Sequence, residues 1–297
     1  MIVVIIFEKD LKMKRTYRSE NLLSLWEFFV ALVLGIVEGL TEFAPVSSTG
    51  HMIIVDDAFL KSKDLYSPEV ANTFKVVIQL GSILAVVILF KDRIINLLGF
   101  TKKKSTGPRL SLSQVLVGLI PAGILGLLFE DYIDEYLFST ETVLIGLVAG
   151  AILMIIADKF GSLSKKTPIE SVDLITYRQA LLIGLFQCIA LWPGFSRSGS
   201  TISGGVLLGL SHRAAADFTF IMAVPIMLGA SALSLVKNLA YFTPEVIPFF
   251  IVGFVSAFIF ALLSIQFFLS LINKIKLVPF AIYRIVLAIV IFFVFVI

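Results

Sequence analysis

Residues 35–51 read GIVEGLTEFAPVSSTGH and place two glutamates, two serines, two threonines and a histidine between apolar segments. FFVALVLGIV runs up to Glu38, and MIIV follows His51. Polar and charged side chains are costly inside a lipid bilayer, where they mark functional sites. This stretch therefore bears on both the fold and the chemistry of the chain.

The composition is that of a helical membrane protein. Hydrophobic residues make up 58% of the 297 residues and the mean hydropathy is +1.01, whereas soluble domains are about 45–50% apolar. Long apolar runs recur along the chain, while a transmembrane barrel would show short alternating segments. The net charge of +3 is small and spread over loops, which gives no signal for nucleic-acid binding, so the expected partners are membrane lipids and no nucleic acid. The single cysteine, Cys188, can form no internal disulfide and is expected to be a buried hydrophobe.

Six apolar runs are long enough to cross a bilayer, which takes about 20 residues in a helix. They are 74–90, 112–129, 141–157, 216–236, 246–269 and 279–297. Two further apolar regions, 22–54 and 178–210, are interrupted near the middle by proline, glycine and clustered serines. These two regions are expected to be broken helices rather than simple spans.

The charged loops predict the orientation of the spans. Lysine and arginine gather in 91–111, 158–178 and 270–278. By contrast, 130–141 contains five acidic residues and no lysine or arginine. Short loops rich in lysine and arginine stay cytoplasmic, so the span 74–90 is predicted to run from outside to inside and the C-terminus to lie outside.

A second copy of the polar stretch begins at Gly184 and reads GLFQCIALWPGFSRSGS, at an offset of 149 residues from Gly35. The aligned pairs are Glu38 with Gln187, Phe43 with Trp192, Ser47 with Ser196, Ser48 with Arg197, Thr49 with Ser198 and Gly50 with Gly199. The spans that follow the two copies run in opposite directions, so the copies are predicted to be inverted. Inverted repeats with broken helices build polar sites near the membrane midplane, where irregular backbone must line protein or water.

The predicted fold is an all-α polytopic membrane protein with six full transmembrane helices and two re-entrant helical hairpins in an inverted-topology repeat. Repeat 1 covers about 30–130 and repeat 2 about 178–297 of one integral membrane catalytic domain, 22–297. Residues 1–21 precede this domain as a basic extension without a signal-peptide pattern.

Glu38 and Glu42 are four residues apart, so they share one face of a helix. Each charged residue costs at least ~2.5–3.5 kcal/mol at mid-membrane on insertion scales, and two adjacent carboxylates also repel each other. A divalent cation, or an arginine from the other repeat, would offset both costs, and carboxylates suit Mg²⁺ or Ca²⁺. The alternative is that both glutamates cap helices or pair with loop lysines.

Ser47, Ser48, Thr49 and His51 follow the proline of the first motif. A serine hydroxyl is a weak nucleophile unless a base lies within hydrogen-bond reach, and one helical turn separates Ser48 from His51. His51 is therefore a candidate base. The alternative is a buried histidine that only satisfies structural hydrogen bonds.

Arg197 lies in the second motif, PGFSRSGST, among serines, a threonine and two glycines. The planar guanidinium of arginine matches phosphate oxygens, and backbone N–H groups at a glycine-rich helix start converge on anions. The alternative is a structural ion pair of Arg197 with Glu38 or Glu42. Paired carboxylates, a nucleophile and an anion cradle together favour phosphoryl transfer on a lipid-borne phosphate, which depends on positioning and charge stabilisation.

The two motifs, EGLTEFAPVSSTGH and PGFSRSGSTISGG, resemble the signatures of the undecaprenyl-diphosphate phosphatase family, also called the bacitracin-resistance family. VVIQLGSILAVV, LLGLSHRAAADFTF and PFAIYR are similar to that family too, and the resemblance covers roughly 24–297. The visible departure is Ala44, where many members carry a bulkier apolar residue. The resemblance implies an acidic, cation-binding pair in Glu38 and Glu42, a nucleophile in Ser48, an acid/base in His51 and a phosphate clamp in Arg197, with Ser47, Thr49, Ser196, Ser198, Gly199 and Thr201 lining the site. Ser47 and a water molecule stay open as alternative nucleophiles.

The resemblance further implies hydrolysis of the C55 lipid undecaprenyl diphosphate to undecaprenyl phosphate and phosphate, with Mg²⁺ or Ca²⁺ as cofactor. Such an enzyme recycles the lipid carrier for peptidoglycan synthesis and confers bacitracin resistance. It lies in the bacterial cytoplasmic membrane with its site open to the outer face, and a homodimer is the protein partner considered. A flippase or secondary transporter on the same inverted repeats is the alternative, although transport alone does not require a nucleophile beside paired carboxylates.

Overall fold

The computed structural model describes residues 23–100, 107–163 and 167–296. The predicted basic extension, 1–21, lies outside the described residues. The loop lysines at 102–104 and 165–166, which contribute to the predicted orientation of the spans, also lie outside the described residues.

Helices make up the described part of the chain, which confirms the predicted all-α class for those residues. The α-helices are α2 (Leu25–Thr41), α3 (Ser48–Met52), α4 (Ser62–Leu65), α5 (Pro68–Leu89), α6 (Lys91–Leu97), α7 (Leu112–Leu128), α8 (Glu130–Tyr136), α9 (Thr140–Leu163), α10 (Tyr177–Ile189), α11 (Arg197–Leu207), α12 (His212–Lys237), α13 (Ile247–Ile275) and α14 (Val278–Phe295). The π-helical segment is η1 (Ile53–Leu60), and the short 3₁₀ turns are η2 (Val172–Leu174) and η3 (Leu239–Tyr241). An isolated β-bridge joins Ile169 and Leu210.

Within the described residues, each of the six predicted spans is mostly helical. Among the described residues, α5, α9, α12, α13 and α14 are long and apolar enough to cross a membrane, while α7 is a shorter apolar helix of 17 residues. Their outer faces carry large apolar side chains, such as Leu127 on α7 and Phe267 on α13, which are 70% and 69% exposed. Water-soluble monomers rarely expose large contiguous apolar patches, so these faces are typical of a multi-pass membrane protein.

Several helices begin with side chains that satisfy the free backbone N–H groups of the first turn. Capping boxes start α2, α7 and α10, formed by Ser24 with Glu27, Ser111 with Gln114 and Thr176 with Gln179. Ser67 and Ser211 cap α5 and α12 with the same backbone angles, φ −64° and ψ 156°. The sequence therefore sets these helix starts locally.

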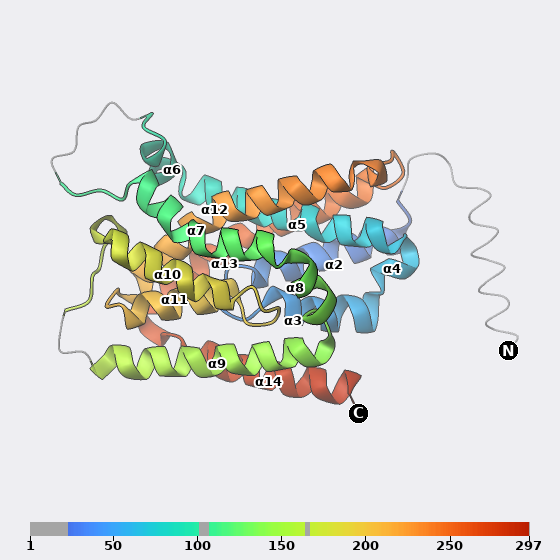
Figure 1. The fold of residues 1–297 in the computed structure, drawn as a ribbon. Coiled ribbons are helices and arrows are strands. Elements are labelled where there is room, and N and C mark those ends of the chain that lie inside the picture. The colour runs from blue at the N-terminus through green and yellow to red at the C-terminus, as the bar shows by residue number, and fades with distance from the viewer. Residues whose placement is uncertain (1–22, 101–106, 164–166, 297) are drawn as a thin grey trace, which may run out of the picture.

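Each of the two interrupted apolar regions is a helical hairpin. α2 ends at Thr41, and after a turn α3 begins at Ser48 and continues into η1. α10 ends at Ile189, and after a turn α11 begins at Arg197. In Figure 1 the α10–α11 hairpin enters the bundle from the end that carries α6, and the α2–α3 hairpin enters from the end that carries α4 and α8. The two turns therefore approach each other inside the bundle.

Gly35 and Gly184, the first residues of the two motifs, make matching contacts. A Cβ on Gly35 would collide with the carbonyl of Gly253 on α13, and one on Gly184 would collide with the carbonyl of Gly118 on α7. The backbone of α2 thus packs closely on α13, as that of α10 packs on α7. Helices α5 and α12 also contact each other, as do α9 and α14. These matching contacts support the predicted internal repeat.

Candidate active site

The turns of the two hairpins contain matching strained serines. Ser47 has φ 69° and ψ 98°, and Ser196 has φ 71° and ψ 116°. Residues other than glycine enter such regions at a cost of order 1–3 kcal/mol. Each Oγ accepts a hydrogen bond from the backbone N–H of the glycine three residues later, Gly50 at 3.4 Å and Gly199 at 3.2 Å. The two copies of the motif therefore begin their second helix with the same capped turn.

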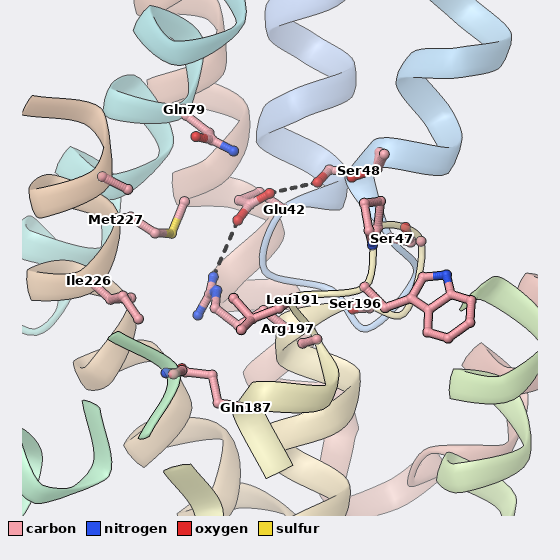
Figure 2. Close-up of a pocket in the computed structure, with 17 residues that line it drawn as sticks. Glu42, Ser47, Ser48, Gln79, Gln187, Leu191, Ser196, Arg197, Ile226 and Met227 are labelled. Atoms are coloured by element: carbon pink, nitrogen blue, oxygen red, sulfur yellow. Dashed lines mark hydrogen bonds and ion pairs between the residues drawn. The ribbon is translucent and has the colours of Figure 1, made fainter. Parts of the chain in front are cut away.

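Ser48 and Arg197 are the first residues of α3 and α11, and Glu42 joins them. Ser48 Oγ donates a hydrogen bond to Oε2 of Glu42 at 2.7 Å, and Nη2 of Arg197 donates to Oε1 at 3.3 Å. Figure 2 shows both contacts as dashed lines that converge on the Glu42 carboxylate. Ser198 Oγ also donates to the carbonyl of Ala44 at 3.1 Å. The two motif turns therefore meet, although 155 residues separate Glu42 from Arg197.

The Arg197 guanidinium is held from several sides. Nη1 donates to the carbonyl of Thr219 on α12 at 3.4 Å, and the group lies 5.6 Å from the ring centroid of Phe43, a geometry that favours a cation over an aromatic face. A guanidinium carries five N–H donors, so the contacts with Glu42 and Thr219 leave others for a bound anion. Its side chain is 16% exposed, which leaves room for contact with a ligand.

His51 has two hydrogen-bond partners, and Ser48 is neither of them. Nδ1 lies 2.7 Å from the carbonyl oxygen of Ser47, and Nε2 lies 2.7 Å from the hydroxyl of Tyr283 on α14. Because a carbonyl only accepts, Nδ1 carries the proton in that contact. His51 is also not among the residues that line the pocket at Glu42. Its predicted acid/base role stays a prediction, whereas its contact with Ser47 supports the strained turn directly.

Glu38 lies one helical turn before Glu42 and is almost fully buried. Its carboxyl interacts with Glu42 and Arg197, and its Oε1 has no hydrogen-bond partner. The described residues contain no group of three or more His, Cys, Asp or Glu side chains that could hold a metal ion. The pair fits a cation that takes its remaining oxygen ligands from substrate and water, rather than an ion enclosed by protein.

A pocket of about 280 Å³ lies against this cluster. Its polar lining comes from both repeats and consists of Glu42, Ser47, Ser48, Thr49, Gln79, Gln187, Ser196 and Arg197. Three predicted site residues, Ser198, Gly199 and Thr201, are fully buried and do not line it. Gly199 donates to Ser196 Oγ, and Thr201 Oγ1 donates to the Arg197 carbonyl at 2.8 Å. These buried residues therefore brace the turn that presents Arg197.

Sequence reasoning assigned no role to Tyr283 and Arg284, neighbours on α14. Tyr283 contacts His51, and Arg284 is fully buried with Nη2 donating to the carbonyl of Gly194 at 2.9 Å and that of Gly146 at 3.2 Å. One helix therefore holds the first turn through His51 and the second through Gly194. The sequence signal that points to Arg284 is its place as an arginine inside α14, an otherwise apolar helix of 18 residues.

Comparison with known proteins places the chain among membrane phosphatases. The family model described as Bacitracin resistance protein BacA matches residues 31–290. An undecaprenyl-diphosphatase of Geobacillus sp. (strain WCH70) is 70% identical over 271 residues, which are 91% of this chain and 98% of the relative. Undecaprenyl-diphosphatase of Bacillus subtilis (strain 168) is 66% identical over 272 residues, 90% of this chain and 98% of the relative. Undecaprenyl-diphosphatase 2 of Bacillus licheniformis is 67% identical over 277 residues, 92% of this chain and 100% of the relative.

Proposed function

Because the chain belongs to the family of the bacitracin resistance protein BacA, we propose that it is an enzyme that hydrolyses undecaprenyl diphosphate to undecaprenyl phosphate and phosphate. The observation that carries the proposal is the Ser48–Glu42–Arg197 cluster at the edge of the pocket. The relatives that share about two thirds of its residues bear the name of this activity. The reaction regenerates the lipid carrier for peptidoglycan synthesis. The same activity confers resistance to bacitracin.

In the first half of the reaction, Ser48 Oγ attacks the terminal phosphorus. The Oγ–P bond forms, the bond from phosphorus to the bridging oxygen breaks, and undecaprenyl phosphate leaves. The Oγ proton passes to Oε2 of Glu42, which already accepts its hydrogen bond at 2.7 Å. Arg197 turns N–H donors to the phosphoryl oxygens and stabilises the charge that they carry.

In the second half, water attacks the same phosphorus and the Oγ–P bond breaks. Glu42 returns its proton to Oγ as the serine leaves, and the proton from water departs with solvent. Phosphate is released and Ser48 is restored. Ser47 and His51 act through the turn, because the carbonyl of Ser47 accepts from His51 and its Oγ caps α3. The predicted proton relay through His51 is the alternative to Glu42 as base.

Glu38 and Glu42 are the residues that would hold Mg²⁺ or Ca²⁺. A bound cation would neutralise charge on the phosphate oxygens and lower the cost of burying the two acids. The free Oε1 of Glu38 supports this role. The proposed phosphate site also includes Ser196 and Thr49. The turn that presents Arg197 is held in place by Ser198, Gly199 and Thr201.

The proposed topology is six spans with two re-entrant hairpins in an inverted repeat, within a single domain of the bacterial cytoplasmic membrane. The C-terminal end of α13 carries Lys274 in its last turn, with Lys276 directly after the helix. It lies at the end of the bundle that also carries α6 (Figure 1). The acidic α8 and the end of α14 lie at the opposite end. The positive-inside tendency favours α8 on the outer side of the membrane, and an opening of the site to that face is part of the proposal. A homodimer stays a prediction.

The test is release of phosphate from undecaprenyl diphosphate by the purified full chain, with and without a chelator of divalent cations. We expect turnover that the chelator abolishes and added Mg²⁺ or Ca²⁺ restores. A protein that binds the lipid and moves it across vesicles without releasing phosphate would favour the flippase alternative.

A further inference from the structure

The pocket has an apolar wall opposite its polar cluster. This wall comes from α7, α12 and the turn after α10 and consists of Ala122, Ala190, Leu191, Ile226, Met227 and Ala230. In Figure 2 Ile226 and Met227 lie on the side away from Ser47 and Ser48. An apolar wall beside a phosphate site suits the hydrocarbon that a lipid diphosphate carries.

The apolar wall draws on both α7 and α12, and one of its residues is exposed. Ala230 lines the pocket and is also exposed on the surface. A Cβ on its neighbour Gly229 would meet nothing within 4 Å, and one on Gly126 of α7 would meet only Leu191. Small residues therefore lie next to the apolar wall on both α7 and α12.

Each of these two helices carries a proline directly before a pocket residue. Pro121 precedes Ala122 in α7, and Pro225 precedes Ile226 in α12. A proline inside a helix removes one backbone hydrogen bond and crowds the preceding turn. Each proline therefore marks the place where its helix, α7 or α12, departs most readily from regular helical geometry.

Gln187 adds an independent sign of a ligand. It lines the pocket, is 3% exposed, and neither its Oε1 nor its Nε2 has a hydrogen-bond partner. Figure 2 shows it on the other side of Arg197 from Glu42, toward the apolar wall. A buried amide without partners is costly, so a polar group of the ligand is expected beside it.

The size of the pocket limits what it can hold. A volume of about 280 Å³ lies just below the roughly 300–1,000 Å³ of ligand pockets, and it cannot enclose a C55 chain together with a diphosphate. We propose that Gln187 binds the phosphate attached to the chain, and that the polyprenyl chain leaves sideways between α7 and α12 over Ala122 and Ala230 into the lipid. This inference rests on the proposed function.

The lateral exit is tested with Ala230→Trp and a matched control, Leu228→Trp. Leu228 lies on the same helix and is exposed, but it does not line the pocket. Ala230→Trp should raise KM for undecaprenyl diphosphate about ten-fold or more, because a chain that loses apolar contact over several methylenes loses that much affinity. Leu228→Trp should leave KM unchanged. Equal KM values for the two variants would overturn the exit.

A second measurement decides the exit if the tryptophan variant does not fold. Ala230→Cys and Leu228→Cys, each combined with Cys188→Ser, are labelled with a lipid-soluble maleimide. Undecaprenyl phosphate should protect position 230 and not position 228, while inorganic phosphate should protect neither. Labelling at position 230 that the lipid does not slow would overturn the exit.

The role of Gln187 is tested by the two products, because each carries one phosphate of the substrate. Gln187→Leu should raise the inhibition constant of undecaprenyl phosphate by about ten-fold, the effect of losing one good hydrogen bond to a charged group, and leave that of inorganic phosphate unchanged. The reverse pattern would place Gln187 at the terminal phosphate and overturn the assignment. Absence of any phosphate release by the parent protein would instead refute the proposed function.

Discussion

Ser48 and Arg197 hold the same position in two copies of one turn, and the carboxylate of Glu42 lies between them. The copies share their strained serine, their cap and the glycine that completes it. They differ at the residues that face the pocket, where a serine in one copy stands opposite an arginine in the other. The backbone is nearly the same in the two turns but the side chain at this position differs. The proposed nucleophile and the proposed anion clamp therefore face each other.

Ser48→Ala should lower kcat by at least about 10³-fold, since a removed nucleophile leaves only binding and charge stabilisation, while binding of the lipid persists. Ser47→Ala should keep more activity, because its hydroxyl caps α3 and does not contact Glu42. Turnover of both variants at saturating Mg²⁺ is the measurement. An active Ser48→Ala with an inactive Ser47→Ala would move the nucleophile by one residue, and two active variants would leave water as the nucleophile.

Arg197→Lys should lose most of the activity although the positive charge is kept. A planar guanidinium binds Glu42, the Thr219 carbonyl and a phosphate at once, whereas an ammonium is a point charge on a flexible stem. The kcat of the lysine variant is compared with that of the parent. Parental turnover would mean that Arg197 is only the counter-ion of the buried glutamates.

Glu42→Gln should lower kcat by about 10²–10⁴-fold, the usual contribution of a positioned acid or base. His51→Ala should have a smaller effect, because His51 reaches the site through the Ser47 carbonyl and not through Ser48. The two variants are compared in the same detergent at the same metal concentration. A greater loss in His51→Ala than in Glu42→Gln would return the role of base to the histidine.

Glu38→Gln should raise the concentration of Mg²⁺ or Ca²⁺ needed for half-maximal activity. A neutral amide is a weaker ligand for a hard cation than a carboxylate, and Glu38 Oε1 has no other partner. A metal titration of activity checks this result. Glu27→Gln serves as a control, because that glutamate lies on the same helix and caps its start. An unchanged titration midpoint in Glu38→Gln would remove Glu38 from the cation site.

Arg284→Met should lower both the thermal stability and kcat. The change removes the side-chain donor of the Gly194 carbonyl in the turn, and an unsatisfied buried group costs about 1–3 kcal/mol. The loss of kcat should exceed the change in KM, because the Gly194 turn sets the position of Arg197. Thermal unfolding in detergent and steady-state kinetics measure the two effects. A variant that is destabilised but has parental kcat would make Arg284 structural only.

Much of this fold could be predicted because the signals are local. Apolar length predicted the helices α5, α7, α9, α12, α13 and α14, and proline with clustered serines predicted the breaks in α2–α3 and α10–α11. The repeat predicted that Arg197 would lie near the glutamates. Spacing on a helix pointed from Ser48 to His51, but the left-handed conformation of Ser47 starts a new helix, and the Ser48 hydroxyl reaches back across the turn to Glu42.

Other contacts join residues that lie far apart in the sequence, and no local pattern identifies the two partners. Tyr283 meets His51 across 232 residues, and Arg284 meets Gly194 across 90. Such pairs depend on how α14 packs against both hairpins, which periodicity does not determine. The repeat pairs Gln187 with Glu38, but this pairing does not predict a ligand contact. That inference needs the structure, in which Gln187 lines the pocket and its buried amide has no hydrogen-bond partner.

In the proposed reaction, Ser48 forms a covalent bond to phosphorus. The most direct measurement is the stereochemical course at the terminal phosphorus of a substrate made chiral there with sulfur and oxygen isotopes and hydrolysed in isotopically distinct water. Each in-line displacement inverts phosphorus, so attack by Ser48 followed by attack of water predicts net retention of configuration. Net inversion would show a single displacement by water and would exclude a covalent intermediate on Ser48.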